Sequence, residues 1–275
     1  MPTVLVLVLH PSDPPGPLAG WLADAGVEVD VRADVPESLA GVDGLVVLGG
    51  PQNANDPELA PLRALLREAV AAEVPTLGIC LGAQALAVAH GGRVEPSPEC
   101  REIGAQLVAK RTAASTDPLF GARPITPDVI QWHFDAITAL PAGAVQLASS
   151  PVCANQAFRL GRLAWGIQFH IETTPEILRR WAREEAALLP ELDLDLIVSR
   201  AEPVHVDIAE VWAPFMHDFA DIVRDPAAVP PARGVPTSTA APVTDPAAIR
   251  AALAAEANAA RQPLPTPLLR PSGDG

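Results

Sequence analysis

Residues 76–84 place one cysteine, Cys80, between Gly78 and Gly82. The residues before Cys80 are apolar and strand-like, and the residues after it are helix-like. A side chain at such a strand-to-helix turn is pushed into the open, and small neighbours are needed because a Cβ there would obstruct the turn or a substrate. The N–H groups at the start of the following helix point at the sulfur and favour its thiolate form. The pattern therefore predicts a cysteine nucleophile at position 80.

A cysteine nucleophile needs a base, and the base needs an acceptor that orients it. Among the six histidines, His170 is the best candidate, because it follows the apolar run 163–169 at the end of a predicted strand. Active sites of open α/β sheets lie at that edge. Glu172 follows two residues later, so both side chains can leave the same face of an extended segment. Alone this pattern is typical of a solvated strand end; together with Cys80 it predicts a Cys-His-Glu triad.

A third motif, residues 49–51, ends another predicted strand in Gly-Gly-Pro. Glycines let backbone N–H groups approach a ligand closely, so this motif can supply one donor of an oxyanion hole. The N–H of Leu81, directly after the nucleophile, would be the second donor. Taken alone, Gly-Gly-Pro is also an ordinary turn.

Strand-like and helix-like segments alternate through the first ninety residues and must position these groups. The predicted strands are 4–9, 27–31, 42–48 and 74–79, and the predicted helices are 17–25, 56–72 and 81–90. This alternation predicts an α/β fold, an open and mostly parallel sheet with helices on both faces. The later part contains short predicted strands at 103–109, 129–132, 145–149, 154–158 and 163–169, then helices at 174–189 and 208–223. We expect a smaller set of antiparallel strands there.

The composition changes near residue 226. Ten of the 31 prolines lie between Pro226 and Pro271, together with alanine, serine and threonine. We therefore predict one domain over residues 1–225 and a flexible Pro/Ala-rich C-terminal tail over 226–275. A docking segment and a plain extension both fit the tail.

Charge and cysteine usage exclude several classes of function. The formal net charge is −14, which argues against binding nucleic acid or an anionic membrane surface. The chain shows no signal-peptide pattern and no apolar run long enough to span a membrane. Its three cysteines are widely spaced, without metal-ligand pairing, so we expect a cytoplasmic protein with no metal and no cofactor. Cys100 and Cys153 lack a comparable turn and are expected to be ordinary thiols.

The three motifs occur in an order that resembles the signature blocks of the class I (triad) glutamine amidotransferase domain. They read Gly49-Gly50-Pro51, Gly78-Ile79-Cys80-Leu81-Gly82-Ala83-Gln84 and Phe169-His170-Ile171-Glu172. The resemblance covers about residues 3–189, and its nearest subgroup is the stand-alone proteins similar to the amidotransferase domain of GMP synthase. It implies a flavodoxin-like fold.

The resemblance also implies site roles. Cys80 would be the nucleophile, His170 the base and Glu172 its orienting acceptor. Gly50 and Leu81 would supply the oxyanion donors, and Gln84 would lie against bound glutamine. In the segment Trp132-His133-Phe134-Asp135, the histidine and the aspartate would line the mouth of the site.

Two positions depart from the pattern of many relatives. Ile171 stands where a proline often separates the histidine from the glutamate, and Ala83 stands where histidine is common. Neither change removes a catalytic group, but both leave the acceptor substrate unidentified.

The implied activity is hydrolysis of the L-glutamine side-chain amide through a γ-glutamyl thioester, with ammonia passing to an unidentified acceptor or a separate synthetase subunit. One alternative is hydrolysis of γ-glutamyl amides or peptides by the same triad. Another is a non-catalytic regulatory protein that retains the fold. A complete triad argues against the last alternative.

Overall fold

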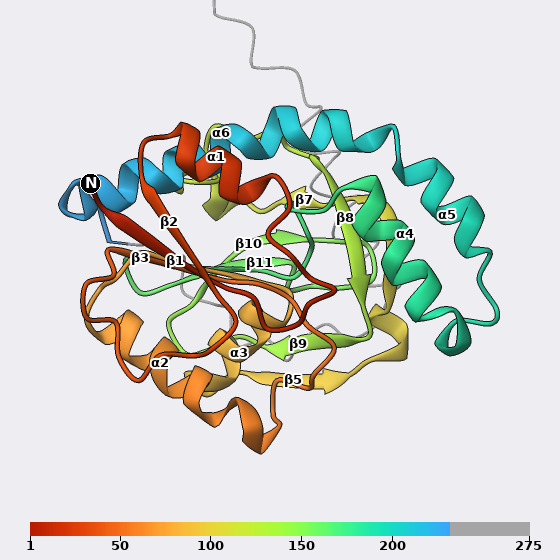
Figure 1. The fold of residues 1–275 in the computed structure, drawn as a ribbon, viewed down its shortest axis with the longest axis horizontal. Helices are drawn as coiled ribbons and strands as arrows, with labels where there is room; N and C mark the ends of the chain where they lie inside the picture. Colours follow the sequence, from red (N-terminus) through yellow and green to blue (C-terminus); the bar gives the residue numbers. More distant parts are fainter. Residues whose placement is uncertain (232–275) are drawn as a thin grey trace, which may run out of the picture.

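An eight-stranded sheet forms the centre of the computed structural model, which describes residues 1–231 (Figure 1). Its strand order is β2-β1-β3-β4-β12-β11-β10-β7. The first five strands in this order run parallel, and the last three run antiparallel. The strands are β1 Thr3–Leu7, β2 Glu28–Arg32, β3 Gly44–Val47, β4 Thr76–Ile79, β7 Ala109–Lys110, β10 Val145–Ser149, β11 Ala157–Leu160 and β12 Ala164–Ile167. The predicted mostly parallel α/β sheet is confirmed.

Helices cover both faces of this sheet because its central strands are apolar on both sides. Every residue of β3, β4 and β12 is buried, as expected for strands between two helical layers. Helices α1 (Leu18–Asp24) and α6 (Val204–Arg224) pack together on one face. Helices α2 (Ala60–Ala71) and α3 (Leu81–Ala89) pack together on the other (Figure 1). A short 3-10 turn, Pro57–Leu59, leads into α2.

Helix α6 closes its side of the core with an aromatic cluster. Trp212, Phe215 and Phe219 lie on α6 and are fully buried. Trp212 contacts Phe169, with ring centroids 5.2 Å apart. The contact supports the segment that leads from β12 into His170.

Two small antiparallel sheets stand beside the central sheet. One pairs β5 (Arg93–Pro96) with β9 (Asp135–Ala139), and the other pairs β6 (Glu102–Leu107) with β8 (Asp128–His133). A single bridge between Ile130 and His170 connects β8 to the end of β12. The bridge brings the predicted site segment around His133 next to the predicted base.

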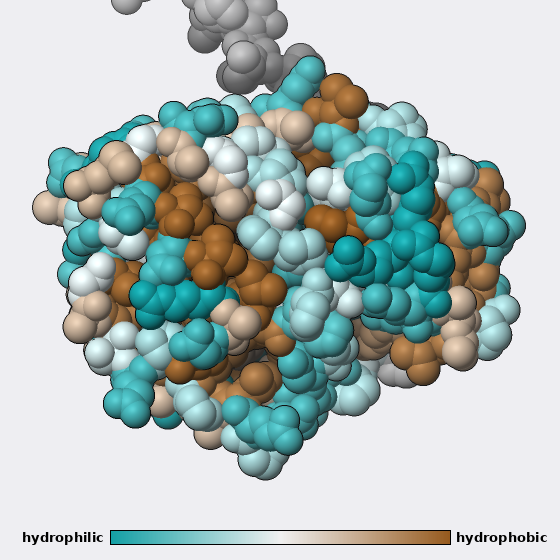
Figure 2. Space-filling view, viewed as in Figure 1, coloured by the Kyte–Doolittle hydropathy of each residue, from teal (hydrophilic) through white to brown (hydrophobic). Residues whose placement is uncertain are grey.

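Helix α4 (Pro175–Glu184) begins directly after the segment that contains Glu172. The Thr174 hydroxyl accepts a hydrogen bond from Ile177 N at 3.3 Å, and Pro175 occupies the first turn; both features are typical of a helix N-terminus. Hydrophilic side chains gather over α4 in Figure 2, while its apolar residues face inward. A 3-10 turn over Ala186–Leu188 and helix α5 (Leu194–Ala201) follow.

Some elements differ from the sequence-based expectations. Helix α5 and strands β5 and β9 were not predicted, and α6 begins earlier than expected. Strand β5 buries only Val94, so its hydrophobic pattern is too weak to identify it. No helix in residues 1–231 is long and apolar enough to cross a membrane.

The structure continues beyond residue 225. A short 3-10 turn over Pro226–Ala228 is followed by Val229, which is 7% exposed. Arg159 donates a hydrogen bond to Pro230 O at 2.7 Å, and Arg162 donates to Pro226 O. The first residues of the predicted tail therefore lie against the domain. Residues 232–275 fall outside the described part, so the predicted boundary and tail stay predictions.

Candidate active site

The predicted triad residues meet at one edge of the parallel sheet. Strands β4 and β12 are neighbours, with Ile79 paired to Ile167. Cys80 directly follows β4, and His170 and Glu172 follow β12 after a few residues. Because parallel strands end at the same edge, this pairing brings together residues ninety positions apart in the chain.

Cys80 occupies a strained turn between β4 and α3. Its φ is 50° and its ψ is −108°, a left-handed conformation that non-glycine residues rarely adopt. Cys80 N donates to Ile167 O at 2.8 Å, and Gln84 N donates to Cys80 O at 2.9 Å. These bonds hold the backbone on both sides of the turn.

The two glycines around Cys80 are required by close backbone packing. A Cβ on Gly82 would lie 2.2 Å from Val47 O, and a Cβ on Gly78 would lie 2.6 Å from Gly82 O. Both distances are far below a van der Waals contact. The strand-to-helix turn predicted from the sequence is present. Gly78 is needed because a Cβ would obstruct the turn, as predicted, whereas Gly82 is needed because a Cβ would meet the backbone of the neighbouring strand β3.

His170 and Glu172 form a short buried pair. The Nδ1 atom of His170 lies 2.7 Å from Glu172 Oε1, and both side chains are 2% exposed. The second oxygen of Glu172 accepts a hydrogen bond from Ile171 N at 2.9 Å. The carboxylate is therefore held from both oxygens and orients the imidazole ring.

The imidazole of His170 is also electrostatically tuned. Burial lowers the pKa of His170, but the charges of Glu172 and Cys80, and its hydrogen bonds to both residues, raise that pKa well above its ordinary value. A buried imidazolium between a carboxylate and a sulfur supports a neighbouring thiolate. The indole of Trp181 stacks near the ring, with centroids 4.7 Å apart.

Gly49 and Gly50 bring the end of β3 against the same centre. A Cβ on Gly49 would lie 3.1 Å from His170 Cε1 and 3.7 Å from Cys80 Cβ. Gly50 lines the cavity in front of Cys80, and Leu81 begins α3 beside it. No backbone carbonyl in residues 1–231 accepts a hydrogen bond from Gly50 N or Leu81 N. Both N–H groups fit the predicted role of oxyanion donors, which stays a prediction.

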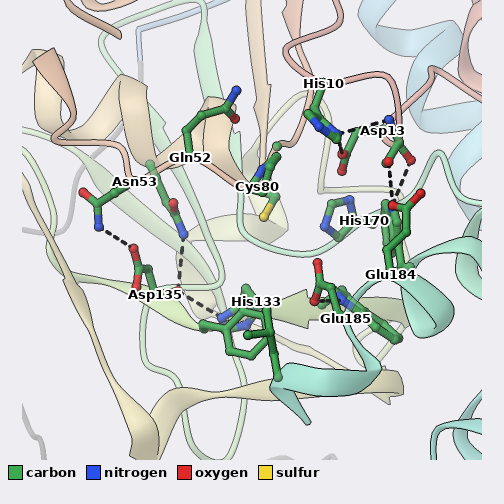
Figure 3. Close-up of a pocket in the computed structure, with 18 residues that line it drawn as sticks. His10, Asp13, Gln52, Asn53, Cys80, His133, Asp135, His170, Glu184 and Glu185 are labelled. Carbon is green, nitrogen blue, oxygen red and sulfur yellow. Dashed lines mark hydrogen bonds and ion pairs between the residues drawn. The ribbon is translucent and has the colours of Figure 1, made fainter. Parts of the chain in front are cut away.

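A cavity of about 370 Å³ opens over Cys80 and His170 (Figure 3). Gln84, His133 and Asp135 all line it, so the predicted binding residues are brought together with the triad. The remaining lining residues are His10, Ser12, Asp13, Gly50, Pro51, Gln52, Asn53, Trp132, Phe134, Trp181, Glu184, Glu185 and Leu188.

Gln84 and His133 are tied to the segment around Asp135. Gln84 Nε2 donates to Asp135 O at 3.3 Å and to Gln168 Oε1 at 3.2 Å. His133 Nδ1 lies 3.1 Å from the same carbonyl, and Asn53 Nδ2 donates to Asp135 Oδ2 at 2.8 Å. These hydrogen bonds hold Gln84, His133 and Asn53 around Asp135 on this side of the cavity.

The opposite side of the cavity carries an acidic wall, Asp13, Glu184 and Glu185. The β1–α1 loop is attached to α4 there: Ser12 Oγ donates to Glu184 Oε2 at 2.6 Å, and Trp181 Nε1 donates to Ser12 O at 2.8 Å. Trp132 Nε1 donates to Glu185 Oε2 at 2.7 Å.

Asp13 packs against Gly49, which also contacts His170. Its Oδ1 atom would lie 3.1 Å from a Cβ on Gly49. Burial raises the pKa of Asp13 to about 6; the charge of His170 lowers this pKa by a smaller amount, and the charge of Glu172 raises it. Burial likewise raises the pKa of Glu185. No lysine or arginine of the described chain lines the cavity.

Sequence reasoning missed the acidic wall and Gln168. Asp13 lies in the loop after β1, and Glu184 and Glu185 lie at the end of α4, where acidic residues are typical of any solvated surface. Position at the carboxyl end of β1 was the one available signal for Asp13.

The other candidate groups lie outside this cavity. Cys100 donates a hydrogen bond to Val152 O at 2.9 Å, and Cys153 is buried nearby. His205 caps a turn by contacting Ala201 O at 2.9 Å. Residues 1–231 contain no cluster of histidine, cysteine, aspartate or glutamate suited to a metal ion.

Comparison with known proteins agrees with this geometry. The family model described as "Glutamine amidotransferase class-I" matches residues 19–181. The chain is 38% identical to the glutamine-hydrolysing GMP synthase of Porphyromonas gingivalis over 144 residues, which are 50% of this chain and 26% of that enzyme. It therefore spans about a quarter of that relative's length.

Two further matches cover most of the length of the matched protein. The glutamine amidotransferase-like protein YfeJ of Salmonella typhimurium is 34% identical over 185 residues, 62% of this chain and 75% of that protein. A glutamine amidotransferase structure from Thermotoga maritima superposes with a TM-score of 0.70 at 26% identity, covering 80% of this chain and 98% of that one. The chain belongs to the class I glutamine amidotransferase family.

Proposed function

We propose that the protein hydrolyses the side-chain amide of L-glutamine through Cys80, His170 and Glu172. The observation that carries this proposal is the buried His170–Glu172 pair, 2.7 Å long, beside a cysteine in a strained turn at the end of β4. The cavity in front of the sulfur and the family membership both support it.

The first half-reaction forms a thioester. The Cys80 thiolate attacks the side-chain amide carbon, and the N–H groups of Gly50 and Leu81 stabilise the oxyanion. His170 gives its proton to the amide nitrogen, the carbon–nitrogen bond breaks, and ammonia leaves. A γ-glutamyl thioester on Cys80 remains.

The second half-reaction releases glutamate. His170, now neutral, takes a proton from water, and the hydroxide formed attacks the thioester carbon. The carbon–sulfur bond breaks and restores the thiolate beside the imidazolium. Glu172 stays ionised in both steps and orients the ring.

The ammonia produced would pass to an acceptor or a separate synthetase. The similarity to part of a GMP synthase supports a partner of this kind, because that relative is itself glutamine-hydrolysing. The three cysteines, which are all free, fit a reducing, cytoplasmic setting.

A glutaminase assay tests this proposal directly. Purified protein is expected to release ammonia and glutamate from L-glutamine, and a candidate synthetase added in equal amount is expected to raise the rate. A glutamine-analogue electrophile is expected to form an adduct at Cys80. Absence of both the adduct and turnover would favour the non-catalytic alternative.

The acidic wall favours a second candidate function, hydrolysis of γ-glutamyl amides that carry a cationic amine. Asp13, Glu184 and Glu185 lie on the His170 side of the sulfur, where the leaving group departs (Figure 3). Trp132 and Trp181, whose ring centroids are 5.8 Å apart, line the same side. Carboxylates and indole faces both attract an ammonium group.

A matched substrate pair separates the two candidates. The γ-glutamyl amides of butylamine and of 1,4-diaminobutane differ chiefly by one terminal ammonium group. Faster hydrolysis of the cationic amide than of both the neutral amide and glutamine would favour the second function. Hydrolysis of glutamine alone would favour the first.

A further inference from the structure

A buried side-chain amide, that of Gln168, lies next to the sulfur of Cys80. Gln168 Nε2 lies 3.7 Å from Cys80 Sγ, within hydrogen-bond reach of a sulfur acceptor. Gln168 is fully buried, and its backbone N–H donates to Gln156 O at 2.8 Å. The side chain is therefore held in a fixed position next to the nucleophile.

The orientation of this amide follows from the groups behind it. The carbonyl oxygen of Asp135 can only accept a hydrogen bond, so Gln84 must present its NH₂ group toward it. The second hydrogen of the same NH₂ group then meets Gln168, at 3.2 Å, and requires the oxygen of Gln168 on that side. Gln168 must consequently turn its own NH₂ group toward Cys80.

A fixed N–H donor distinguishes between the two forms of the cysteine. A thiolate is a full hydrogen-bond acceptor, whereas a thiol is a weak one. The amide cannot rotate to offer its oxygen without leaving two donors of Gln84 and Gln168 face to face, which is costly in a buried site.

We propose that Gln84 and Gln168 form a directed hydrogen-bond chain from the Asp135 carbonyl to Cys80, which makes both glutamines positioning residues for the nucleophile. The inference rests on the proposed function of Cys80. It adds a third support for the thiolate, beside His170 and the N-terminus of α3. It also connects the nucleophile to Asp135 in the cavity wall.

Alkylation of Cys80 tests this chain without requiring any substrate turnover. Wild-type, Gln168→Met and Gln84→Met proteins are treated with iodoacetamide between pH 5 and pH 9, and modification of the Cys80 peptide is followed by mass spectrometry. Methionine keeps the length of glutamine and removes the donor. Gln131→Met is the matched control, because Gln131 is a fully buried amide on β8 whose NH₂ group donates to Gln156 instead.

The expected result is slower alkylation of Gln168→Met, by about threefold to tenfold at pH values below the midpoint of the profile, since one hydrogen bond to the thiolate sulfur is lost. The pH of half-maximal alkylation rises by about half a unit to one unit. Gln84→Met shifts it in the same direction by less, because Gln168 stays in place but loses its fixed orientation. Gln131→Met leaves it unchanged.

An unchanged pH profile in folded Gln168→Met, or an equal shift in Gln131→Met, would overturn the proposal. If Gln168→Met does not fold, Gln168→Glu keeps the shape of the side chain and is expected to slow alkylation more strongly, because a carboxylate replaces the donor. If the variants show this alkylation pattern but the wild type hydrolyses no glutamine, the proposed function is contradicted and the hydrogen-bond chain is still supported.

Discussion

Two buried histidine–carboxylate pairs, His170–Glu172 and His133–Glu102, each place their histidine on the cavity, and the two pairs differ in geometry. In the first pair, Nδ1 and the carboxylate lie 2.7 Å apart; in the second, His133 Nε2 and Glu102 Oε2 lie 3.4 Å apart. All four side chains are nearly inaccessible to solvent. Burial beside a carboxylate is therefore not what distinguishes a candidate base.

The two pairs differ in how their remaining polar atoms are used. Glu172 directs both oxygens to donors, His170 Nδ1 and Ile171 N, and leaves the other ring nitrogen for Cys80. His133 instead directs Nδ1 to the Asp135 carbonyl. Its Nε2 and Glu102 Oε1 have no hydrogen-bond partner within residues 1–231.

Strand pairing explains the difference. Glu102 and His133 face each other across the β6–β8 ladder. Gln156 Nε2 donates a hydrogen bond of 2.5 Å to Glu102 Oε2, the oxygen that lies nearer to His133. His170 and Glu172 lie on one segment, two residues apart. Orientation toward the sulfur, rather than a nearby charge, is therefore what favours His170 over His133 as the proposed base.

The largest effect is expected for Cys80, the proposed nucleophile beside the first pair. Cys80→Ala should lower glutaminase activity by about 10⁴-fold or more, because the thioester cannot form. Steady-state ammonia release measures this. Cys100→Ser is the matched control and should retain activity; turnover surviving in Cys80→Ala would refute the assignment.

Replacing each histidine by asparagine tests the comparison itself. His170→Asn should lower kcat by about 10³-fold, because both general acid and general base are lost. His133→Asn should change kcat by less than about tenfold, with any larger effect on KM, since it lines the cavity without facing the sulfur. Similar losses of kcat in both variants would show that the geometric distinction is wrong.

Replacing the two carboxylates should also affect the His170 pair more than the His133 pair, but with a smaller loss of kcat than replacing the histidines. Glu172→Gln is expected to lower kcat by about 10²-fold, since the ring loses its orienting acceptor. The charge of Glu172 helps to hold the pKa of His170 above its ordinary value, so the imidazolium should persist to higher pH in the wild type. The alkaline limb of the activity profile should therefore move to lower pH in Glu172→Gln. Glu102→Gln should leave that limb in place.

The smallest expected effect is a change in stability on replacing Asp13, which lies next to the His170–Glu172 pair without belonging to it. Burial raises the pKa of Asp13 to about 6, so the unfolded chain releases this proton at lower pH than the folded one. Ionisation of Asp13 thus costs the folded state stability as the pH rises from about 4 through 6. Asp13→Asn should be more stable than the wild type by about 1–3 kcal/mol at pH 7.5, with a smaller gain at pH 4.5.

Urea unfolding at the two pH values measures this gain. Asp34→Asn, which removes an exposed carboxylate, is the control and should show no comparable pH-dependent gain. Equal stability of Asp13→Asn and the wild type at pH 7.5 would mean that water or counter-charge offsets the burial of Asp13.

Local sequence determined much of the site because its constraints are short-range. The strand-to-helix turn at Cys80 needs glycine at positions 78 and 82, because a Cβ at either position would clash with neighbouring backbone atoms. The alternation of buried strands and amphipathic helices identified the parallel sheet, since each central strand is apolar on both faces. His170 and Glu172 were identified from their place after a strand and their two-residue spacing.

Only the tertiary structure decided which distant residues complete the cavity. Asp13, Gln168 and Glu184 carry no local pattern, and they meet because β1, β12 and the end of α4 converge at one sheet edge. Likewise, His133 and His170 are equivalent in type and burial, and only their hydrogen-bond partners separate them. Side-chain direction depends on contacts between segments far apart in the chain, so it follows from packing and strand register rather than from any short stretch of sequence.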